Sequence, residues 1–529
     1  MRNMRKLTSL LLALVMVFSL AVTAFADEAT GETEAPAETT YTITIPAGDA
    51  HNYEIYQIFT GDLHEGVLSN IKWGQNGTGT KDELVDETTL NAVKNASGTN
   101  AQKLAVIMQY VDLSKAAHAT ATGSATEAVN VEVAPGYYLL KDASIGTDDA
   151  YTTFIVLVVE DVTIARKAAK PGIDKQVWDE ETDDDKELDE NWGETADHEL
   201  NETFQFKLIA TLTGDKDYAD YETYKLIFHD SMSKGVTYLG NETVTVVSGG
   251  TTIELTAGQY TVAYSTDATT GITTLTVTVT DMKAITGVDL SQDTTVTVIY
   301  DAKLNEHAVI GNIDENLNDV YLEYSNNPNW DLTWGTDGKD NDGDGEKDEK
   351  DEKDEPTGKT EKDTVWVFTY EVKVNKIDGN TKEELPDAEF QMKNAAGKWL
   401  VVDENGKVQQ WIDDQSKASV LKSDENGVFS VIGLDHGTYS LVETKAPNGY
   451  NLLTKEVEVN VVATHEEVTA ESAKTEFTVN EKSEITVENK AGIVLPETGG
   501  MGTTMIYILG AVMVLGAGVL LVTKRRMAM

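Results

Sequence analysis

The side chains of this chain that could take part in chemistry are lysines, acids and asparagines on β-rich segments. A buried lysine amine loses its positive charge more readily and can then attack a carbonyl carbon. The groupings typical of an enzyme are missing, because the 529 residues include eight histidines, no cysteine and no HExxH or Ser/His/Asp arrangement. The chain is therefore not expected to be an enzyme that acts on an external substrate.

A five-residue segment near the C-terminus consists of Leu495, Pro496, Glu497, Thr498 and Gly499. An uncharged stretch at 506–522 and a basic end at 524–526 follow it. Such a stretch lies at the short end of the roughly 17 to 25 residues that span a bilayer, and basic residues remain on the cytoplasmic side. The order resembles the LPxTG sorting signal of Gram-positive surface proteins. The resemblance implies that a sortase cysteine attacks the Thr498–Gly499 bond and that an amine then replaces the enzyme.

The N-terminus has the pattern of an export signal. Basic residues occur in the first six positions, an apolar core covers 7–20, and Ala24-Phe25-Ala26 is a small-x-small cleavage site. A segment of this kind is removed on export, so we expect a mature chain that begins near Asp27. The absence of cysteine means that no disulfide can stabilise the exported domains.

The balance of charge excludes one class of partner. The sequence has 42 basic and 90 acidic residues, which gives a formal net charge of -48. Nucleic acids and anionic membrane surfaces would repel such a chain. We therefore expect no nucleic-acid partner, and the charge is typical of a solvated extracellular surface.

Alternating β-branched and aromatic runs predict an all-β chain of tandem Ig-like β-sandwich domains in an elongated array. One helical stretch is expected near 101–115 in the first domain. A signal helix and a transmembrane helix complete the ends. The predicted organisation is a signal peptide at 1–26, an N-terminal domain at 27–170, a middle sandwich at 171–333, an acidic linker at 334–363, a third sandwich at 364–490 and a sorting region at 491–529.

The third predicted sandwich resembles a CnaB domain. The resemblance rests on a first-strand Lys376-Ile377-Asp378, the segment from Glu443 through Ala446-Pro447 to Gly449-Tyr450, and a last-strand Asn489. In such domains the lysine and the asparagine condense into an intramolecular isopeptide bond. The resemblance implies that Lys376 joins Asn489 and that Glu443 catalyses the reaction.

The middle sandwich carries a parallel set of residues and resembles the CnaA-type isopeptide domain of backbone pilins. Lys175 lies in its opening segment, Asp230 lies in the segment 227–230, and Asn318 precedes the segment that begins at Val320. The resemblance implies a bond between Lys175 and Asn318 with Asp230 as the acid. Asn316 lies two residues away on the same face of an extended segment, so it is an alternative acceptor.

The junction of the first two domains contains the expected intersubunit amine. In sortase-assembled backbone pilins this junction holds a lysine, usually in a VxVYPK-like context. Lys167 corresponds to that position by its distance from Lys175, although Ala165-Arg166 stands where Tyr-Pro or Asn-Pro is usual. Lys170 is the competing acceptor, and a basic linker without chemistry is the remaining alternative.

The acidic linker has the spacing of a calcium loop. Its spacing resembles that of an EF-hand or dockerin-like loop, with Gly345 at the turn. Lys347 replaces the usual apolar residue and no flanking helices are evident, so a solvated acidic linker is the alternative. No other cofactor is expected. The candidate Ca²⁺ ligands are Asp340, Asp342, Asp344, Asp348 and Asp351.

Together these resemblances imply the major subunit of a fimbrial shaft on a Gram-positive cell. A class C sortase would join Thr498 of one copy to Lys167 of the next, and a housekeeping sortase would attach the finished fibre to peptidoglycan. Other copies of this chain are the expected partners, with minor pilins and host or environmental ligands as further candidates. The alternative is a monomeric wall-anchored adhesin or a minor tip pilin, which needs no acceptor lysine.

Overall fold

A computed structural model describes residues 39–98, 100–144, 153–164, 170–179, 191–221, 223–310, 316–326, 357–465, 475–479, 484–492 and 501–526. The predicted signal peptide, the acceptor Lys167, the acidic calcium-loop candidates and the segment from Leu495 to Gly499 lie outside the described residues. In the described part of the chain, strands dominate and form six sheets. The prediction of an all-β chain is thereby confirmed.

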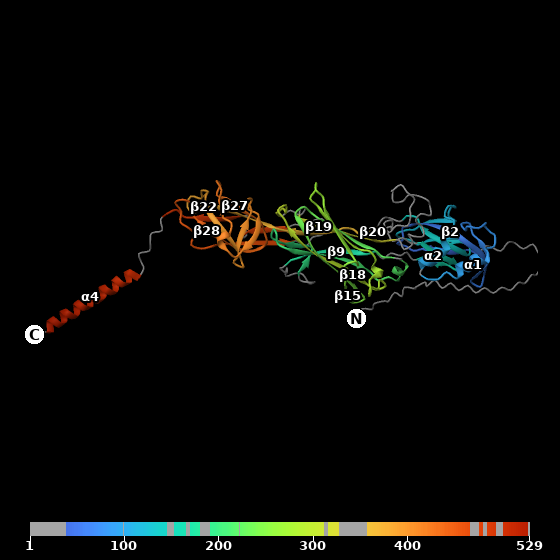
Figure 1. Ribbon diagram of the computed structural model, residues 1–529, viewed down its shortest axis with the longest axis horizontal. Coiled ribbons are helices and arrows are strands. Elements are labelled where there is room, and N and C mark those ends of the chain that lie inside the picture. The colour runs from blue at the N-terminus through green and yellow to red at the C-terminus, as the bar shows by residue number, and fades with distance from the viewer. Residues whose placement is uncertain are drawn as a thin grey trace, which may run out of the picture.

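The N-terminal domain, blue in Figure 1, consists of two sheets and two short helices. One sheet has the order β5-β1-β8 and the other β3-β2-β6-β7, with β4 paired to β2. The predicted helical stretch is α2, and a second helix, α1, precedes it and begins at the N-cap Asp86, whose side chain accepts from Thr89 N. The elements are β1 (Tyr41–Ile45), β2 (Asn52–His64), β3 (Val67–Trp73), α1 (Glu87–Lys94), α2 (Asn100–Met108), β4 (Ala119–Thr122), β5 (Val129–Val133), β6 (Gly136–Asp142), β7 (Thr153–Val158) and β8 (Val162–Thr163).

The middle domain is a sandwich of two larger sheets. Their orders are β10-β9-β12-β18-β14-β15 and β11-β21-β19-β13-β17-β16, with β20 paired to β19. In the strands of these sheets, inward and outward side chains alternate. In β18, for example, every second residue is buried. The elements are β9 (Gly172–Trp178), β10 (Trp192–Gly193), β11 (Thr195–Asp197), β12 (Phe204–Leu212), η1 (Lys216–Asp220), β13 (Leu226–Met232), β14 (Val236–Ser248), β15 (Thr251–Glu254), β16 (Thr261–Thr266), β17 (Thr273–Val279), η2 (Met282–Ala284), β18 (Thr294–Leu304), β19 (Leu317–Ser325), β20 (Thr357–Lys359) and β21 (Asp363–Phe368).

The third domain, orange in Figure 1, is a smaller sandwich. Its first and last strands, β22 and β31, are parallel neighbours in the sheet β27-β22-β31. The opposing sheet has the order β25-β24-β23-β28-β29-β30, with β26 paired to β23. The elements are β22 (Tyr370–Asp378), β23 (Glu389–Asn394), β24 (Trp399–Val402), β25 (Val408–Ile412), η4 (Gln415–Lys417), β26 (Leu421–Lys422), β27 (Val428–Leu434), β28 (Gly437–Lys445), β29 (Val457–His465), β30 (Thr475–Val479) and β31 (Ile485–Asn489).

The boundary between the last two sandwiches differs from the predicted position at 364. Strand β21 pairs antiparallel with β19 and parallel with β11, so Asp363–Phe368 belongs to the middle domain. Strand β20, inside the predicted linker 334–363, also pairs with β19. Gly358 of β20 lies against the Tyr324 ring, where an added Cβ would come within 2.8 Å. The middle sandwich thus takes its last strands from beyond the acidic segment.

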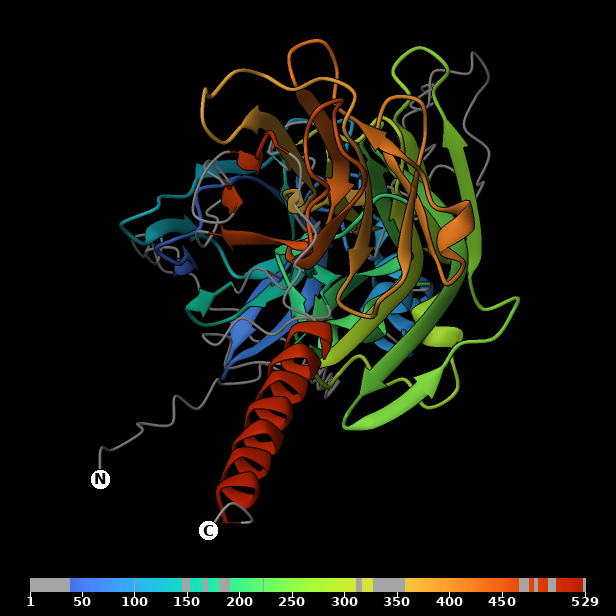
Figure 2. The same cartoon turned by 90° about the vertical axis from the view of Figure 1, so that its left-hand side faces the viewer.

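The C-terminal helix α4 (Met501–Arg526) stands at the end of the chain, away from the sheets in Figures 1 and 2. Its apolar span Tyr507–Arg525 is not buried against any described residue. The length and composition suit a membrane-spanning helix, as the sequence predicts.

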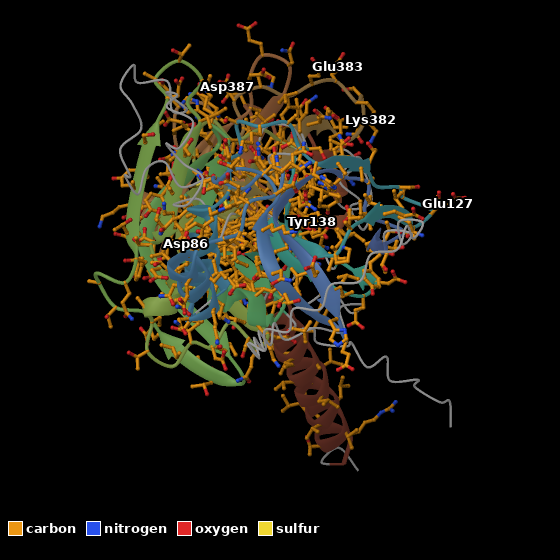
Figure 3. The ribbon with its side chains drawn as sticks, turned by 90° about the vertical axis from the view of Figure 1, so that its right-hand side faces the viewer. Asp86, Glu127, Tyr138, Lys382, Glu383 and Asp387 are labelled. Carbon is orange, nitrogen blue, oxygen red and sulfur yellow. The ribbon has the colours of Figure 1, made fainter. Side chains whose placement is uncertain are left out.

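In Figure 3 the acidic Glu127 and Asp387 lie at the rim of the domains, whereas Tyr138 lies inside the N-terminal domain. The three β domains follow one another along the long axis of Figure 1.

Candidate functional site

Two lysines are fully buried, one in the middle domain and one in the third. Lys175 lies on β9 beside Val177 on the inward face, and Lys376 lies on the inward face of β22 between Val374 and Asp378. Each side chain is 0% exposed. Among the lysines that the structure describes, these two alone fall in the buried class. A buried ammonium is costly unless it is paired or neutralised, so each site must contain a compensating group.

In the middle domain the two sheets contribute different members of the site. Lys175 on β9 and Tyr300 on β18 come from one sheet, while Asp230 on β13 and Asn318 on β19 come from the other. Lys175 Nζ contacts Asp230 Oδ2. Tyr300 donates its hydroxyl proton to Asp230 Oδ1 at 2.9 Å and accepts from Asn318 Nδ2 at 2.7 Å. The predicted lysine, acid and asparagine are therefore brought together in one buried cluster.

The geometry distinguishes between the two predicted acceptors of the middle domain. Asn316 is also buried, but its side-chain amide donates to Val309 O at 2.7 Å and accepts from Val309 N at 2.9 Å. These two bonds hold Asn316 against a loop. Asn318 instead points its amide into the site and leaves its Oδ1 without a hydrogen bond among the described residues. Of the two asparagines, Asn318 thus belongs to the cluster around Lys175 and Asp230.

Burial shifts both titratable members of the middle cluster toward neutrality. It lowers the pKa of the Lys175 amine, although the neighbouring Asp230 opposes this shift. Burial likewise raises the pKa of Asp230, against the opposing effect of Lys175. A neutral amine beside a protonated carboxyl group is the combination that amide formation requires. The Lys175 amine also lies 5.2 Å from the centroid of the Phe206 ring, so aromatic side chains wall the site.

In the third domain the lysine and the asparagine lie on paired strands of one sheet. Lys376 on β22 and Asn489 on β31 are in direct contact through Nζ and Oδ1. Glu443 comes from β28 in the opposing sheet, with Oε1 at 3.8 Å from Lys376 Nζ. Its other oxygen, Oε2, accepts from Asn489 Nδ2 at 3.1 Å and from Leu453 N at 2.8 Å. One carboxyl group therefore spans both reacting side chains.

The loop after Glu443 completes this site. Asn489 Nδ2 also donates to Asn451 O at 2.8 Å, and the Tyr450 hydroxyl donates to Asp378 Oδ2 at 2.7 Å. These contacts fix the orientation of the Asn489 amide and leave its Oδ1 facing the amine. Burial lowers the pKa of Lys376 to about 8. At pH 7 about a tenth of this amine is therefore neutral, far more than for a lysine in water.

Both clusters contain the groups that one condensation would require. In that reaction the neutral lysine Nζ would attack the asparagine Cγ, the Cγ–Nδ2 bond would break, and ammonia would leave. The carboxyl group accepts a proton from the amine and returns one to the departing nitrogen. The product is an uncharged amide, so it removes the cost of a buried ion. No metal or cofactor is needed for this step.

The structure does not place most of the residues predicted to form the intersubunit bond or the calcium site. Thr498 of the sorting segment and Lys167 lie outside the described residues, as do the calcium candidates such as Asp344. Lys170, the competing acceptor, is described and exposed just before β9. Their roles stay predictions from the sequence.

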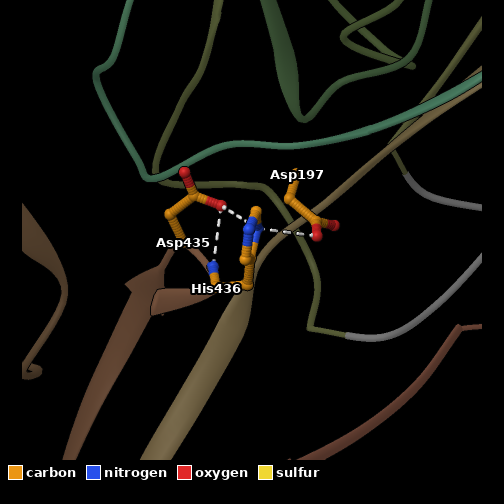
Figure 4. A group of neighbouring side chains, drawn as sticks. All are labelled: Asp197, Asp435 and His436. Atoms are coloured by element: carbon orange, nitrogen blue, oxygen red, sulfur yellow. Dashed lines mark hydrogen bonds and ion pairs between the residues drawn. The ribbon is translucent and has the colours of Figure 1, made fainter. Parts of the chain in front are cut away.

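A second polar cluster joins the middle and third domains (Figure 4). His436 Nδ1 lies 3.1 Å from Asp197 Oδ2 and 3.3 Å from Asp435 Oδ1. Asp197 Oδ1 accepts from the Tyr370 hydroxyl at 2.5 Å. Three such groups within 4.8 Å of one another could hold a metal ion, but they also bond to one another and to Tyr370. We interpret the cluster as an ion-pair network between two domains.

Further backbone and side-chain contacts connect the middle and third domains, and we call this contact region the domain joint. Leu200 N donates to Gly433 O at 3.0 Å, Asn201 Nδ2 donates to Val408 O at 3.1 Å, and Trp411 Nε1 donates to Glu199 Oε2 at 2.5 Å. The apolar core is continuous across the joint, from Val177 to Val487. The middle and third domains therefore form one packed unit.

Sequence reasoning missed two parts of this arrangement. Tyr300 was not distinguished from the other inward residues of a Thr-rich strand, although a tyrosine on a buried face needs a partner for its hydroxyl. The joint residues, such as His198 and Glu199, lie in an irregular segment with no recognisable pattern. Only their burial in the structure reveals them.

Comparison with known proteins identifies three segments. The model of the Gram-positive pilin backbone subunit 2 Cna-B-like domain matches residues 202–328, the SpaA prealbumin-like fold domain matches 370–476, and the LPXTG cell wall anchor motif matches 487–528. The first match contains Asp230 and Asn318, and the second contains Lys376 and Glu443.

Two individual relatives are also surface proteins of Gram-positive bacteria. A trypsin-resistant surface T6 protein of Streptococcus pyogenes is 26% identical over 184 residues, which cover 34% of this chain and 28% of that relative. The solved T6 backbone pilin of serotype M6 Streptococcus pyogenes has a TM-score of 0.53 and 16% identity. That likeness covers 87% of this chain and 100% of the other, and it shows a shared fold. The three matched segments thus resemble, in this order, a Gram-positive pilin backbone domain, a prealbumin-like fold domain and a cell wall anchor.

Proposed function

We propose that this protein is the repeating subunit of a pilus shaft, polymerised through a bond between Thr498 of one copy and Lys167 of the next. A sortase cysteine would attack the Thr498 carbonyl, release the chain from Gly499 onward and hold the rest as a thioester. The Lys167 amine of another copy would then displace the sulfur and form an amide. A housekeeping sortase would transfer the finished fibre to peptidoglycan by the same exchange.

The proposal includes two intramolecular bonds, Lys175–Asn318 and Lys376–Asn489, with Asp230 and Glu443 as the acids. The observation that carries it is the double occurrence of a fully buried lysine in contact with an acid or asparagine in consecutive domains. A shaft transmits tension through every subunit, so covalent links between strands are suited to that role. A chain without cysteine has no disulfide for this purpose.

The intersubunit bond is tested in the organism that makes the protein. Replacing Lys167 with Ala should abolish the high-mass ladder of cell-wall extracts on a denaturing gel, because the thioester finds no acceptor. Lys170→Ala is the matched control and should leave the ladder intact. Loss of the ladder in Lys170→Ala alone would move the acceptor to that residue. A single band from the unmodified protein would instead favour the wall-anchored adhesin.

A further inference from the structure

The two lysine sites connect acid to asparagine in different ways. Glu443 Oε2 accepts directly from Asn489 Nδ2 at 3.1 Å. Asp230 makes no hydrogen bond to Asn318 in the part of the chain that the structure describes, because its Oδ1 and Oδ2 meet Tyr300 and Lys175 instead. An aspartate side chain is one methylene shorter than a glutamate. The middle domain therefore has a gap between its acid and its amide, and the Tyr300 hydroxyl fills it.

Tyr300 also holds the amide in place. The Asn318 side chain makes one hydrogen bond among the described residues, from Nδ2 to the Tyr300 hydroxyl at 2.7 Å, and its Oδ1 has none. In the third domain, by contrast, Asn489 Nδ2 meets both Glu443 and Asn451 O. The orientation of Asn318 thus depends on a single contact, whereas that of Asn489 does not.

We propose that Tyr300 is a catalytic residue of the middle domain, which relays a proton from Asp230 to the departing nitrogen of Asn318. This inference rests on the proposed Lys175–Asn318 bond and adds to it a fourth participant. Its basis is the unbroken chain of contacts from Lys175 Nζ through Asp230 and Tyr300 to Asn318 Nδ2. The third domain needs no such residue, because Glu443 touches both partners.

The proton movements balance along this chain. Lys175 Nζ forms a bond to Asn318 Cγ and passes a proton to Asp230 Oδ2. Once Cγ is tetrahedral, Nδ2 becomes a proton acceptor, and the Tyr300 hydroxyl turns from Asp230 Oδ1 toward it. The phenol proton then moves to Nδ2 as the proton on Asp230 Oδ1 moves to the Tyr300 oxygen. The Cγ–Nδ2 bond then breaks and ammonia leaves, so that Tyr300 ends as a neutral phenol. Burial, reinforced by Asp230, raises the pKa of Tyr300 well above its usual value, so the phenol is neutral before and after the step.

The test compares variants of the full chain that are isolated unfolded from inclusion bodies, refolded in detergent and digested. Mass spectrometry follows the covalently joined fragment that contains Lys175 and Asn318. Tyr300→Phe keeps the ring and removes the hydroxyl, and we expect this fragment to form at least tenfold more slowly, since general acid–base catalysis contributes about 10²–10⁴-fold. The Lys376–Asn489 fragment in the same sample should form at the normal rate and reports that the chain has folded.

Two further variants make the result specific. Tyr224→Phe removes another buried hydroxyl of the same domain and should leave the rate unchanged, since Tyr224 lies in the core and has no contact with the reacting groups. Asp230→Glu in the Tyr300→Phe background should restore part of the rate, because the longer acid can reach Asn318 as Glu443 reaches Asn489. If Tyr300 had only a structural role, the rate of bond formation would not recover in this double variant.

The outcomes separate the two proposals. If the unmodified chain never yields the joined Lys175–Asn318 fragment, the proposed bond is wrong and the relay falls with it. If the unmodified chain yields it and Tyr300→Phe yields it equally fast, the bond stands and the relay is overturned. Slowing in Tyr300→Phe without any recovery in the double variant reduces Tyr300 to a packing residue and also overturns the relay.

Discussion

At the scale of single residues, burial shifts the two inward lysines toward the neutral form that the proposed bonds require. Lysine amines in water are charged and unreactive, but burial lowers the pKa of Lys376 to about 8. The same low-polarity environment shifts Lys175 downward and Asp230 upward. Both shifts favour the neutral pair over the ion pair. In the proposed reaction, packing between two sheets would therefore take the place of an enzyme.

Removal of the acid in the third domain should block its bond. We expect Glu443→Ala to retain a free amine at Lys376, and its mass to lie about 17 Da, one ammonia, above the mass calculated for the same variant with the Lys376–Asn489 bond formed. Glu488→Ala is the matched control, because Glu488 precedes Asn489 but is exposed and pairs with Lys382. Intact-mass measurement of both variants decides the matter. A normal mass for Glu443→Ala would show that the acid is dispensable.

The lysines, acids and asparagines of the two buried clusters could be selected from the sequence, whereas Tyr300 could not. Lys175, Asp230, Lys376 and Glu443 interrupt inward apolar positions of regular strands, where a charged residue is conspicuous. Tyr300 occupies such a position as an ordinary aromatic core residue. Its role depends on a distance to Asp230 across the sandwich, and no spacing along the chain encodes that distance.

At the scale of elements, the strand alternation of the sandwiches was predictable and the boundary between them was not. Apolar and aromatic residues continue without a break from β21 into β22, so no change of composition marks the end of the middle domain. The boundary between the two domains instead lies at the domain joint, where the Tyr370 hydroxyl at the start of β22 donates to Asp197 on β11. Such long-range contacts are invisible in local sequence.

One glycine permits the close approach at this joint. Gly433 has a φ of +88°, and a Cβ there would lie 2.3 Å from Leu200 Cδ1. Gly433→Ala should therefore cost more than the roughly 1–2 kcal/mol of a left-handed alanine. Gly397→Ala is the matched control, because Gly397 has a φ of +76° with nothing within 4 Å of the added Cβ. Thermal unfolding should separate the two, and equal losses of stability would contradict a tight joint.

The joint should also respond to pH. Burial raises the pKa of Glu199 to about 7 and that of Asp435 to about 6. Burial lowers the pKa of His198, but its hydrogen bond and ion pair with Glu202 outweigh burial and leave it raised. All three groups thus bind protons more tightly in the folded state. The free energy of unfolding should therefore fall as the pH rises from about 4 to about 7 through the range of the two acids. It should fall further as the pH passes the raised pKa of His198.

Calorimetry of the unmodified chain should accordingly give a higher unfolding temperature at pH 5 than at pH 8. The control is a double variant, Glu199→Gln with Asp435→Asn, which keeps the shapes and removes two titrating groups. Its unfolding temperature should depend less on pH, although the overall negative charge is nearly the same. An unchanged pH dependence in the double variant would exclude the joint as its source.

At the scale of the whole molecule, the three domains should differ in mechanical strength. The lysines described in the N-terminal domain are all outside the buried class, so that domain has no counterpart of the Lys175 and Lys376 sites among its described residues. In the other two domains a bond between the first and a late strand would carry tension past the hydrogen-bonded sheets. When the isolated chain is pulled from its two ends, the N-terminal domain is therefore expected to unfold first. In the proposed shaft, tension would enter each subunit at Lys167 and leave at Thr498, so it would not pass through this domain.

Single-molecule pulling on the chain tests this difference. We predict one unfolding step of about 40 nm, the extended length of roughly 120 residues, which corresponds to the N-terminal domain. The middle and third domains should resist unfolding in the same force range. Asn318→Ala and Asn489→Ala should each add a further step, and steps from all domains of the unmodified chain would contradict the assignment.

The whole account depends most directly on the two internal bonds. Mass spectrometry of proteolytic fragments, from protein released from the cell wall, measures them without any variant. The predicted result is two joined fragments, one that links Lys175 to Asn318 and one that links Lys376 to Asn489, each about 17 Da lighter than the sum of its parts. Separate linear fragments of unshifted mass at both sites would contradict the account.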